Sequence, residues 1–141
     1  SDLAIAGLAG EPRFTERGFA PWISSAPALV IPCTSEEAYR RRYAEDDKLG
    51  PDVALEWPVP FWFLDAGCGL VALLLATVDA GLAAGFLRIA DPPAMKALLG
   101  IPEQVEPIGI VTVGHPAADR RSGSLRRGRR PEAEQLRWER W

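Results

Sequence analysis

A chain of 141 residues is long enough for one domain with a hydrophobic core and too short for two. Its 48% hydrophobic and 25% charged residues are typical of a soluble globular protein, and a net charge of -3 argues against a general nucleic-acid binder. The charge is unevenly distributed. From Asp119 onward there are eight arginines and four acidic residues, whereas the preceding residues include eight basic and fifteen acidic ones. A basic tail on an acidic body predicts that the tail meets an anionic group.

The two cysteines, Cys33 and Cys68, are far apart and have no CxxC spacing or nearby histidine. This excludes a zinc cluster and a disulfide framework, and it indicates buried, unreactive thiols in a cytoplasmic protein. The first residues lack the basic and then apolar pattern of a signal peptide. Residues 61–87 are almost wholly apolar, but Asp65 and Asp79 leave a shorter uncharged run than the roughly 20 residues that span a bilayer. We therefore expect no membrane partner and a buried core helix here.

The first 20 residues are rich in glycine and proline and are poorly defined by their pattern, although a short helix before Phe14 fits it. Residues 28–33 form a short apolar run that is typical of a buried strand. Thr34 with Glu37 three residues later has the spacing of a capping box. This pattern predicts a polar surface helix over residues 35–45.

Residues 46–60 have the composition of a loop, which leads into a cluster of aromatic residues. The cluster consists of Trp57, Phe61, Trp62 and Phe63. A long helix is then predicted over about residues 63–83. Small residues form one stripe of this helix (Gly69, Ala72, Ala76, Ala80 and Ala83), and bulky residues form the other (Leu70, Val71, Leu74, Leu75 and Val78). The small stripe suits either packing inside the monomer or a helix–helix seam between two subunits.

Gly81 ends the long helix, and residues 85–89 fit a short strand or an extended turn. Asp91 is a typical N-cap and is followed by proline, which predicts a short helix that ends at Gly100. Residues 108–113 are apolar on both faces, as expected of a central strand. The order of these elements predicts a single α+β domain over residues 1–141, with residues 117–141 as a C-terminal extension.

No side chain is predicted to act as a catalytic acid, base or nucleophile. His115 is the sole histidine, and no nucleophile elbow accompanies it, so a polar strand end explains it better than catalysis. Asp46, Asp47 and Asp52 lack a spaced set of partner ligands, and we expect no metal site. The glycines around Cys68 lie inside an apolar helix rather than between a strand and a helix, so they do not form a phosphate-binding loop.

The arginine-rich tail carries the clearest functional signal. Arg126, Arg127, Arg129 and Arg130 follow one another closely, and converging guanidinium groups bind phosphate through paired, charge-assisted hydrogen bonds. The alternative is a solvated basic tail with a loose attraction to RNA. Leu136, Trp138 and Trp141 disfavour a fully solvated tail, because large apolar side chains are costly to leave in water. We expect the tail to dock on its own core or on a partner subunit.

From Pro21 to the end, the sequence resembles the FMN-dependent nitroreductase family. The motifs that carry the resemblance are Ala26-Pro27 before the first strand, Asp65 leading into an Ala/Leu-rich helix, Gly81-Leu82 at the end of that helix, residues 98–102, residues 107–116 and the closing Arg130-Pro131 with its tryptophans. The match covers the C-terminal two-thirds of a usual member. The N-terminal flavin-binding segment of the family is absent from this sequence, which suggests a truncated chain.

The resemblance implies an α/β sandwich with a long central helix, in an intertwined homodimer that holds FMN at its interface. The C-terminal tail would wrap the partner subunit. Leu87, Arg88 and Ile89 would lie beside the flavin ring, with the backbone N–H of Arg88 or Ile89 near flavin N5. Arg127 and Arg129 would meet the FMN phosphate, and Arg130 is the alternative in another register. Family members often carry Glu-Gly where this chain has Arg88 and Ile89.

The implied reaction is hydride transfer from NAD(P)H through FMN to an electron-poor, small aromatic substrate, in which the cofactor supplies the chemistry. The donor could be NADH, NADPH or a deazaflavin. Trp57, Phe61 and Trp62 would form a substrate lid with Tyr43 and Arg41 nearby, although core packing explains these aromatics equally well. Two alternatives stay open: a non-catalytic dimeric remnant that has lost FMN, and a nucleic-acid binder that acts through its arginine tail.

Overall fold

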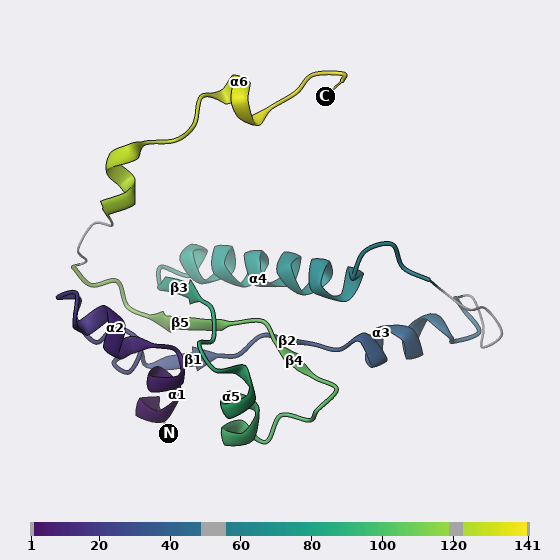
Figure 1. Cartoon of the computed structure of the whole chain (residues 1–141), viewed down its shortest axis with the longest axis horizontal. Coiled ribbons are helices and arrows are strands. Elements are labelled where there is room, and N and C mark those ends of the chain that lie inside the picture. The colour runs from purple at the N-terminus through teal and green to yellow at the C-terminus, as the bar shows by residue number, and fades with distance from the viewer. Residues whose placement is uncertain (1, 49–55, 119–122, 141) are drawn as a thin grey trace.

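The computed structural model describes residues 2–48, 56–118 and 123–140 (Figure 1). Helices and strands are mixed along the chain, which confirms the α+β class. The elements are α1 (Asp2–Leu8), α2 (Glu11–Thr15), β1 (Ala28–Val30), β2 (Cys33–Thr34), α3 (Glu36–Tyr43), α4 (Phe61–Asp79), β3 (Ala83–Leu87), α5 (Pro92–Leu99), β4 (Glu106–Pro107), β5 (Ile110–Gly114), the 3-10 helix η1 (Gly123–Arg127) and α6 (Glu132–Gln135).

The main sheet has three antiparallel strands in the order β1-β5-β3. The predicted central strand is confirmed as β5, whose residues Ile110 and Val111 are fully buried. Leu87 of β3 pairs with Ile110, and Phe86 pairs with Val111. Strands β2 and β4 form a second, two-stranded antiparallel pair. The apolar run on both faces of β5 therefore reflects burial from both sides.

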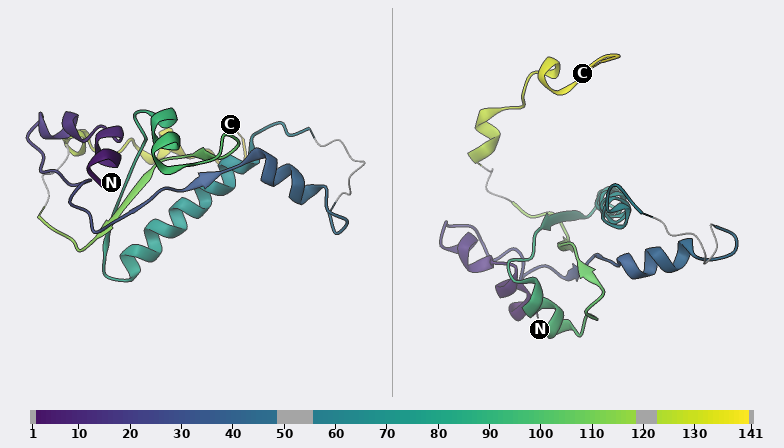
Figure 2. Two further views of the ribbon diagram at one scale, coloured as in Figure 1. Left: turned by 90° about the horizontal axis from the view of Figure 1, so that it is seen from below. Right: turned by 45° about the vertical axis from the view of Figure 1, so that its right-hand side comes forward.

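Helices cover the two faces of the main sheet unequally. Helices α1, α2 and α5 lie on one side and α4 lies on the other (Figures 1 and 2). The hydrophobic core sits on the first side, and its buried members are Ile5, Ala6, Ala9, Ile23, Ile89, Met95 and Ile110. Side chains alternate between the faces of a strand, so Val111 points away from the face that carries Ile110. Val111 is buried but does not belong to the core cluster.

Helix α5 begins and ends as its sequence predicts. The Ala94 N–H donates to the Asp91 carboxylate at 3.1 Å, which caps the N-terminus. Gly100 closes the helix with φ 66°, in the left-handed region that favours glycine. Just before β5, a Cβ on Gly109 would clash with the Phe86 ring and lie 2.8 Å from the Leu87 carbonyl oxygen, so only glycine fits there.

One expectation for the N-terminal half needs correction, and another is confirmed. The N-cap of α3 is Ser35 rather than Thr34, because the Ala38 N–H donates to the Ser35 hydroxyl at 3.2 Å. The Thr34 hydroxyl instead donates to the Trp62 carbonyl at 2.8 Å, which joins β2 to the start of α4. The poorly patterned first 20 residues supply α1 and α2, and the helix expected before Phe14 is α1.

Helix α4 is not the buried core helix that we expected. It begins at Phe61 and ends at Asp79, and Thr77 is its sole buried residue. Among the described residues it is also the one helix that is long and apolar enough to cross a membrane, by length and composition alone, and 6% of its apolar window is buried. A core helix of a water-soluble protein passes the same test of length and composition, but it would be mostly buried. The outward face of α4 is therefore not covered by the residues that the structure describes.

The expectation of buried thiols is also wrong. Cys33 and Cys68 are both exposed and both free. Cys33 lies on the short strand β2 and Cys68 lies on the outward face of α4, so neither reaches the core. Partial desolvation nevertheless raises the pKa of the Cys33 thiol, which disfavours its reactive thiolate.

Candidate functional site

The three residues predicted to lie beside a flavin ring are at the C-terminal end of β3. Leu87 is half-buried against the core cluster, and the Ile89 side chain is buried within it at 5% exposure. The Arg88 side chain points to the exposed surface. The Ala90 N–H donates to the Leu8 carbonyl at 2.9 Å, which ties this segment to α1. A ligand at this edge would therefore meet the Arg88 side chain and the backbone, because the Ile89 side chain is used for packing.

The arginines predicted to hold a phosphate lie far from this edge. Arg127 ends η1 and Arg129 follows it, and both are exposed. Together, η1 and α6 extend away from the sheet, as Figure 1 and the right-hand view of Figure 2 show. One chain thus does not bring Arg127 and Arg129 together with Leu87, Arg88 and Ile89. The residues present in a single chain do not fit a complete FMN site.

The tail also does not dock on its own core, which was one of the two expectations. Leu125 is 67% exposed and Trp138 is 79% exposed, and α6 has no buried residue. Docking on a partner subunit stays a prediction. Trp141, which the same argument used, lies outside the described residues.

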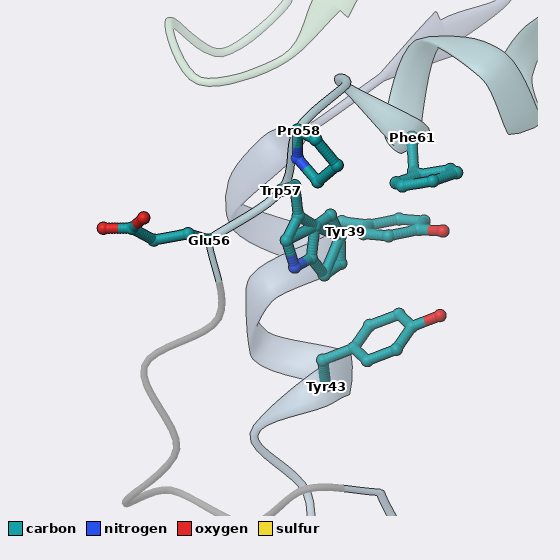
Figure 3. Close-up of a pocket in the computed structure, with 6 residues that line it drawn as sticks. All are labelled: Tyr39, Tyr43, Glu56, Trp57, Pro58 and Phe61. Atoms are coloured by element: carbon teal, nitrogen blue, oxygen red, sulfur yellow. The ribbon is translucent and has the colours of Figure 1, made fainter.

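An aromatic pocket lies between α3 and the start of α4 (Figure 3). Its volume is about 260 Å³ and its lining residues are Tyr39, Tyr43, Glu56, Trp57, Pro58 and Phe61. The Trp57 ring meets Tyr39 edge-on at 4.6 Å and Tyr43 edge-on at 4.8 Å between ring centroids. The Trp57 indole nitrogen is buried, and none of the described residues accepts a hydrogen bond from it. The aromatic rings that line the cleft suit a flat aromatic molecule.

The structure brings together some of the residues that the sequence predicted to form a substrate lid. Tyr43, Trp57 and Phe61 line the pocket, whereas Trp62 packs behind Trp57 at 6.1 Å between ring centroids. Arg41 does not line the pocket. Residues 46–60, predicted as a loop, lie partly outside the described residues.

Sequence reasoning missed Tyr39, which is central to this pocket. Its hydroxyl donates to the Asp65 carboxylate at 2.8 Å. This hydrogen bond is the main reason why the pKa of Tyr39 is well above its ordinary value, and desolvation and the neighbouring Tyr43 act in the same direction. Tyr39 therefore stays neutral and holds α3 against α4. Its position on the same face of α3 as Tyr43, four residues later, is the signal that could have revealed it.

The other candidates from the sequence are His115 and the possible metal ligands. His115 is exposed directly after β5, as a polar strand end should be. Over residues 2–48, 56–118 and 123–140, no group of three or more His, Cys, Asp or Glu side chains is placed to hold a metal ion. The prediction of no catalytic side chain is untested by the structure.

Neither a family model nor a curated protein sequence matches this chain. Solved structures do match it. NfrA1 of B. megaterium is 22% identical with a TM-score of 0.72, over 99% of this chain and 53% of that protein. The NADPH:FMN oxidoreductase from Vibrio harveyi, complexed with NAD+, is 19% identical with a TM-score of 0.68, and the match covers 99% of this chain and 54% of that protein. A nitroreductase family protein from Streptococcus pneumoniae is 18% identical with a TM-score of 0.64, and the match covers 99% of this chain and 76% of that protein.

The chain has the nitroreductase fold. The matches cover nearly all of it, so the poorly patterned first 20 residues are part of the same fold. The chain spans about half the length of NfrA1 and of the Vibrio harveyi enzyme. At these identities the likeness is one of architecture, and function needs its own argument.

Proposed function

We propose that this chain is part of an FMN-dependent oxidoreductase of nitroreductase type, which uses NAD(P)H to reduce a small, electron-poor aromatic compound. The observation that carries the proposal is the likeness of almost the whole chain to solved structures that include an NADPH:FMN oxidoreductase. The lack of a predicted acid, base or nucleophile agrees with a reaction whose chemistry resides in a cofactor.

The proposal places the cofactor site between two copies of the chain. FMN supplies the redox chemistry when it is bound. Leu87, Arg88 and Ile89 would flank the ring of the cofactor at the edge of β3, and Arg127 and Arg129 would bind its phosphate. These two groups lie apart in one chain because η1 extends away from the sheet. A tail that reaches across to a second copy would bring phosphate-binding arginines to that copy's site.

The outward face of α4 supports a homodimer. Exposed apolar side chains recur along it with alternating spacings of three and four, which is the pattern of a helix seam. They are Phe61, Leu64, Cys68, Val71, Leu75 and Val78. The small residues Gly69, Ala72 and Ala76 are exposed as well, so packing inside the monomer does not explain them. A large exposed apolar surface marks an interface. A water-soluble, cytoplasmic dimer without a membrane or nucleic-acid partner is part of this proposal.

The aromatic pocket beside α3 is the proposed substrate site. Flat aromatic compounds stack on aromatic rings, and the rings of Tyr43, Trp57 and Phe61 line this pocket.

The test is to add FMN to the purified protein and follow flavin absorbance and molecular size through gel filtration. We expect flavin to co-elute at the size of a dimer. The double substitution Arg127→Ala/Arg129→Ala should release the flavin and leave the dimer intact. Arg137→Ala/Arg140→Ala removes the same charge from the end of the tail and should leave flavin binding unchanged.

A dimer that binds no flavin would support a second candidate, a non-catalytic protein that keeps the fold. Arg88 and Ile89, which stand where family members often carry Glu-Gly, favour this candidate. A monomer without flavin would contradict both proposals.

A further inference from the structure

The aromatic pocket between α3 and the start of α4 is built mainly from rings. Four of its lining residues are aromatic, and they are Tyr39, Tyr43, Trp57 and Phe61. In Figure 3 the rings of Phe61, Tyr39 and Tyr43 lie one above another, with Trp57 beside them. The pocket volume of about 260 Å³ is just below the roughly 300–1,000 Å³ of ligand sites, so a compound with a single ring fits it.

Carboxylates, rather than basic groups, accompany these rings. Glu56 is among the described lining residues, and none of those residues is basic. Residues 49–55, which precede Glu56 in the sequence, include no lysine or arginine either. The Tyr39 hydroxyl, which Figure 3 shows on the side of the rings opposite Glu56, donates to the Asp65 carboxylate at 2.8 Å. Two carboxylates therefore flank the rings and favour a positive ligand.

The arginines of the neighbouring α3 do not reverse this charge. Arg40 forms an ion pair with Glu36 at 2.7 Å, and Arg42 forms one with Asp47 at 2.6 Å. Arg41, between them, is exposed. None of the three arginines is among the lining residues.

The rings themselves attract cations, because the face of an aromatic ring carries a negative partial charge. The Lys48 ammonium lies 5.6 Å from the centroid of the Tyr43 ring, so one ring of the pocket already holds a cation of the chain itself. The Tyr39 ring is polarised by the hydrogen bond to Asp65, which adds negative charge to the ring. Rings of this kind are the usual binding surface for quaternary ammonium groups.

We propose that this pocket binds a single-ring aromatic compound that carries a quaternary ammonium group. The inference rests on the proposed function and deepens it, because it names the class of substrate for the proposed substrate site. A quaternary ammonium substituent withdraws electrons from its ring, in agreement with an electron-poor substrate. The charged group would lie against the rings, between the carboxylates of Glu56 and Asp65.

Calorimetric titration of the flavin-free protein with two matched compounds tests the proposal. The compounds are (4-hydroxyphenyl)trimethylammonium and 4-tert-butylphenol, which have nearly the same shape and differ by a charged nitrogen in place of a carbon. The titrations use a mildly acidic buffer, in which both phenols are neutral. The cation should bind at least about fivefold more tightly than the neutral compound.

Substitutions at one ring separate attraction to the ring from simple apolar burial. Tyr43→Leu keeps an apolar wall but removes a ring, and it should reduce the preference for the cation at least about twofold. Tyr43→Phe keeps the ring and should leave the preference nearly unchanged. Circular dichroism and thermal unfolding confirm that each variant folds.

A second pair of variants tests the carboxylates. Glu56→Gln/Asp65→Asn should reduce the preference for the cation at least about threefold. Glu37→Gln/Glu103→Gln removes the same charge from exposed positions outside the pocket and should change the preference less than about 1.5-fold. Equal losses in the two double variants would show nonspecific attraction to an acidic protein and would overturn the proposal.

Equal binding of the two compounds would overturn the proposal as well, as would a preference that survives Tyr43→Leu unchanged. Flavin binding is measured separately by gel filtration, so the two proposals can fail independently. A dimer that binds flavin but does not prefer the cation would keep the proposed oxidoreductase and remove this class of substrate. A preference for the cation without flavin binding would keep the selectivity of the pocket and contradict the oxidoreductase.

Discussion

The two sides of the central sheet differ in how completely the chain covers them. On the side of α1, α2 and α5, small and medium apolar residues interlock, and Ile23, Met95 and Ile110 are fully buried. On the other side, α4 buries Thr77 and leaves Leu75 66% exposed and Val78 62% exposed. The first side is complete within one chain, whereas the second has an apolar outer surface that only another molecule can cover.

This difference shows that apolar composition does not determine where a helix is buried. Helix α4 is more apolar than α5, yet α5 is amphipathic and places Met95 in the core. A helix that is apolar on all sides can pack one stripe on its own sheet and still expose the opposite stripe. The arrangement of elements decides how much of such a helix is covered.

The largest expected effect is a difference in stability between substitutions on the two sides of the central sheet. Met95→Ala should lower the free energy of unfolding by about 2–5 kcal/mol, because it leaves a cavity in the closed core. Leu75→Ala on the outer face of α4 should change the unfolding of the monomer by less than about 0.5 kcal/mol. Urea unfolding at low protein concentration measures both. A large loss for Leu75→Ala in the monomer would mean that α4 is covered within the chain.

The outer face of α4 should instead control association. Leu75→Glu places a charge in the proposed seam and should raise the dimer dissociation constant at least about tenfold. Leu3→Glu is the matched control, since Leu3 is 79% exposed on α1 at the other side of the sheet. Analytical ultracentrifugation measures both constants. Equal effects of the two substitutions would place the dimer contact elsewhere.

A polar contact stabilises the side of the sheet that α1, α2 and α5 cover. Glu11 is 7% exposed and accepts two backbone N–H groups, so Glu11→Ala should cost about 1–3 kcal/mol by leaving these buried donors unpaired. Glu11→Gln keeps one acceptor oxygen and should cost less. Glu16→Ala, an exposed change just after the same helix, should be nearly neutral. Thermal and urea unfolding of the three variants gives the order.

The smallest effect concerns the pH dependence of the contact between α3 and α4. Folding raises the pKa of Tyr39, so this group stabilises the fold below the ordinary tyrosine pKa of about 10 and loses that contribution as the pH rises further. Asp65→Asn should lower the pKa of Tyr39 toward its ordinary value. In a Tyr43→Phe background, ultraviolet titration of tyrosinate reports Tyr39 alone. An unchanged titration curve would show that Asp65 does not hold the hydroxyl in solution.

Local features of the chain could be predicted well. The Asp91 cap, the Gly100 end and the two-sided apolar strand β5 each depend on neighbouring residues, and all are confirmed. The N-cap of α3 was placed one residue too early. Thr34 and Ser35 are both common N-cap residues, serine the more favourable, and the Thr34 hydroxyl is used in its hydrogen bond to the Trp62 carbonyl.

The candidate site could be predicted only in part. Trp57 and Phe61 are close in sequence, and their shared pocket was foreseeable, but Tyr39 joins them from α3 through its contact with Asp65. The cleft between α2 and the end of β3 had no sequence signal at all. Arg13 and Arg88, which both line it, are far apart in the sequence and meet because α2 packs beside the end of β3.

The sequence by itself determined the α+β class, the order of the main elements and the central place of β5, because turn residues, caps and apolar periodicity act over a few residues. Only the tertiary structure decided that α4 and both cysteines are exposed and that the tail arginines stand apart from β3. It alone also decided which distant side chains form the two pockets. Burial and convergence depend on how elements pack over long sequence separations, and no local pattern encodes that packing.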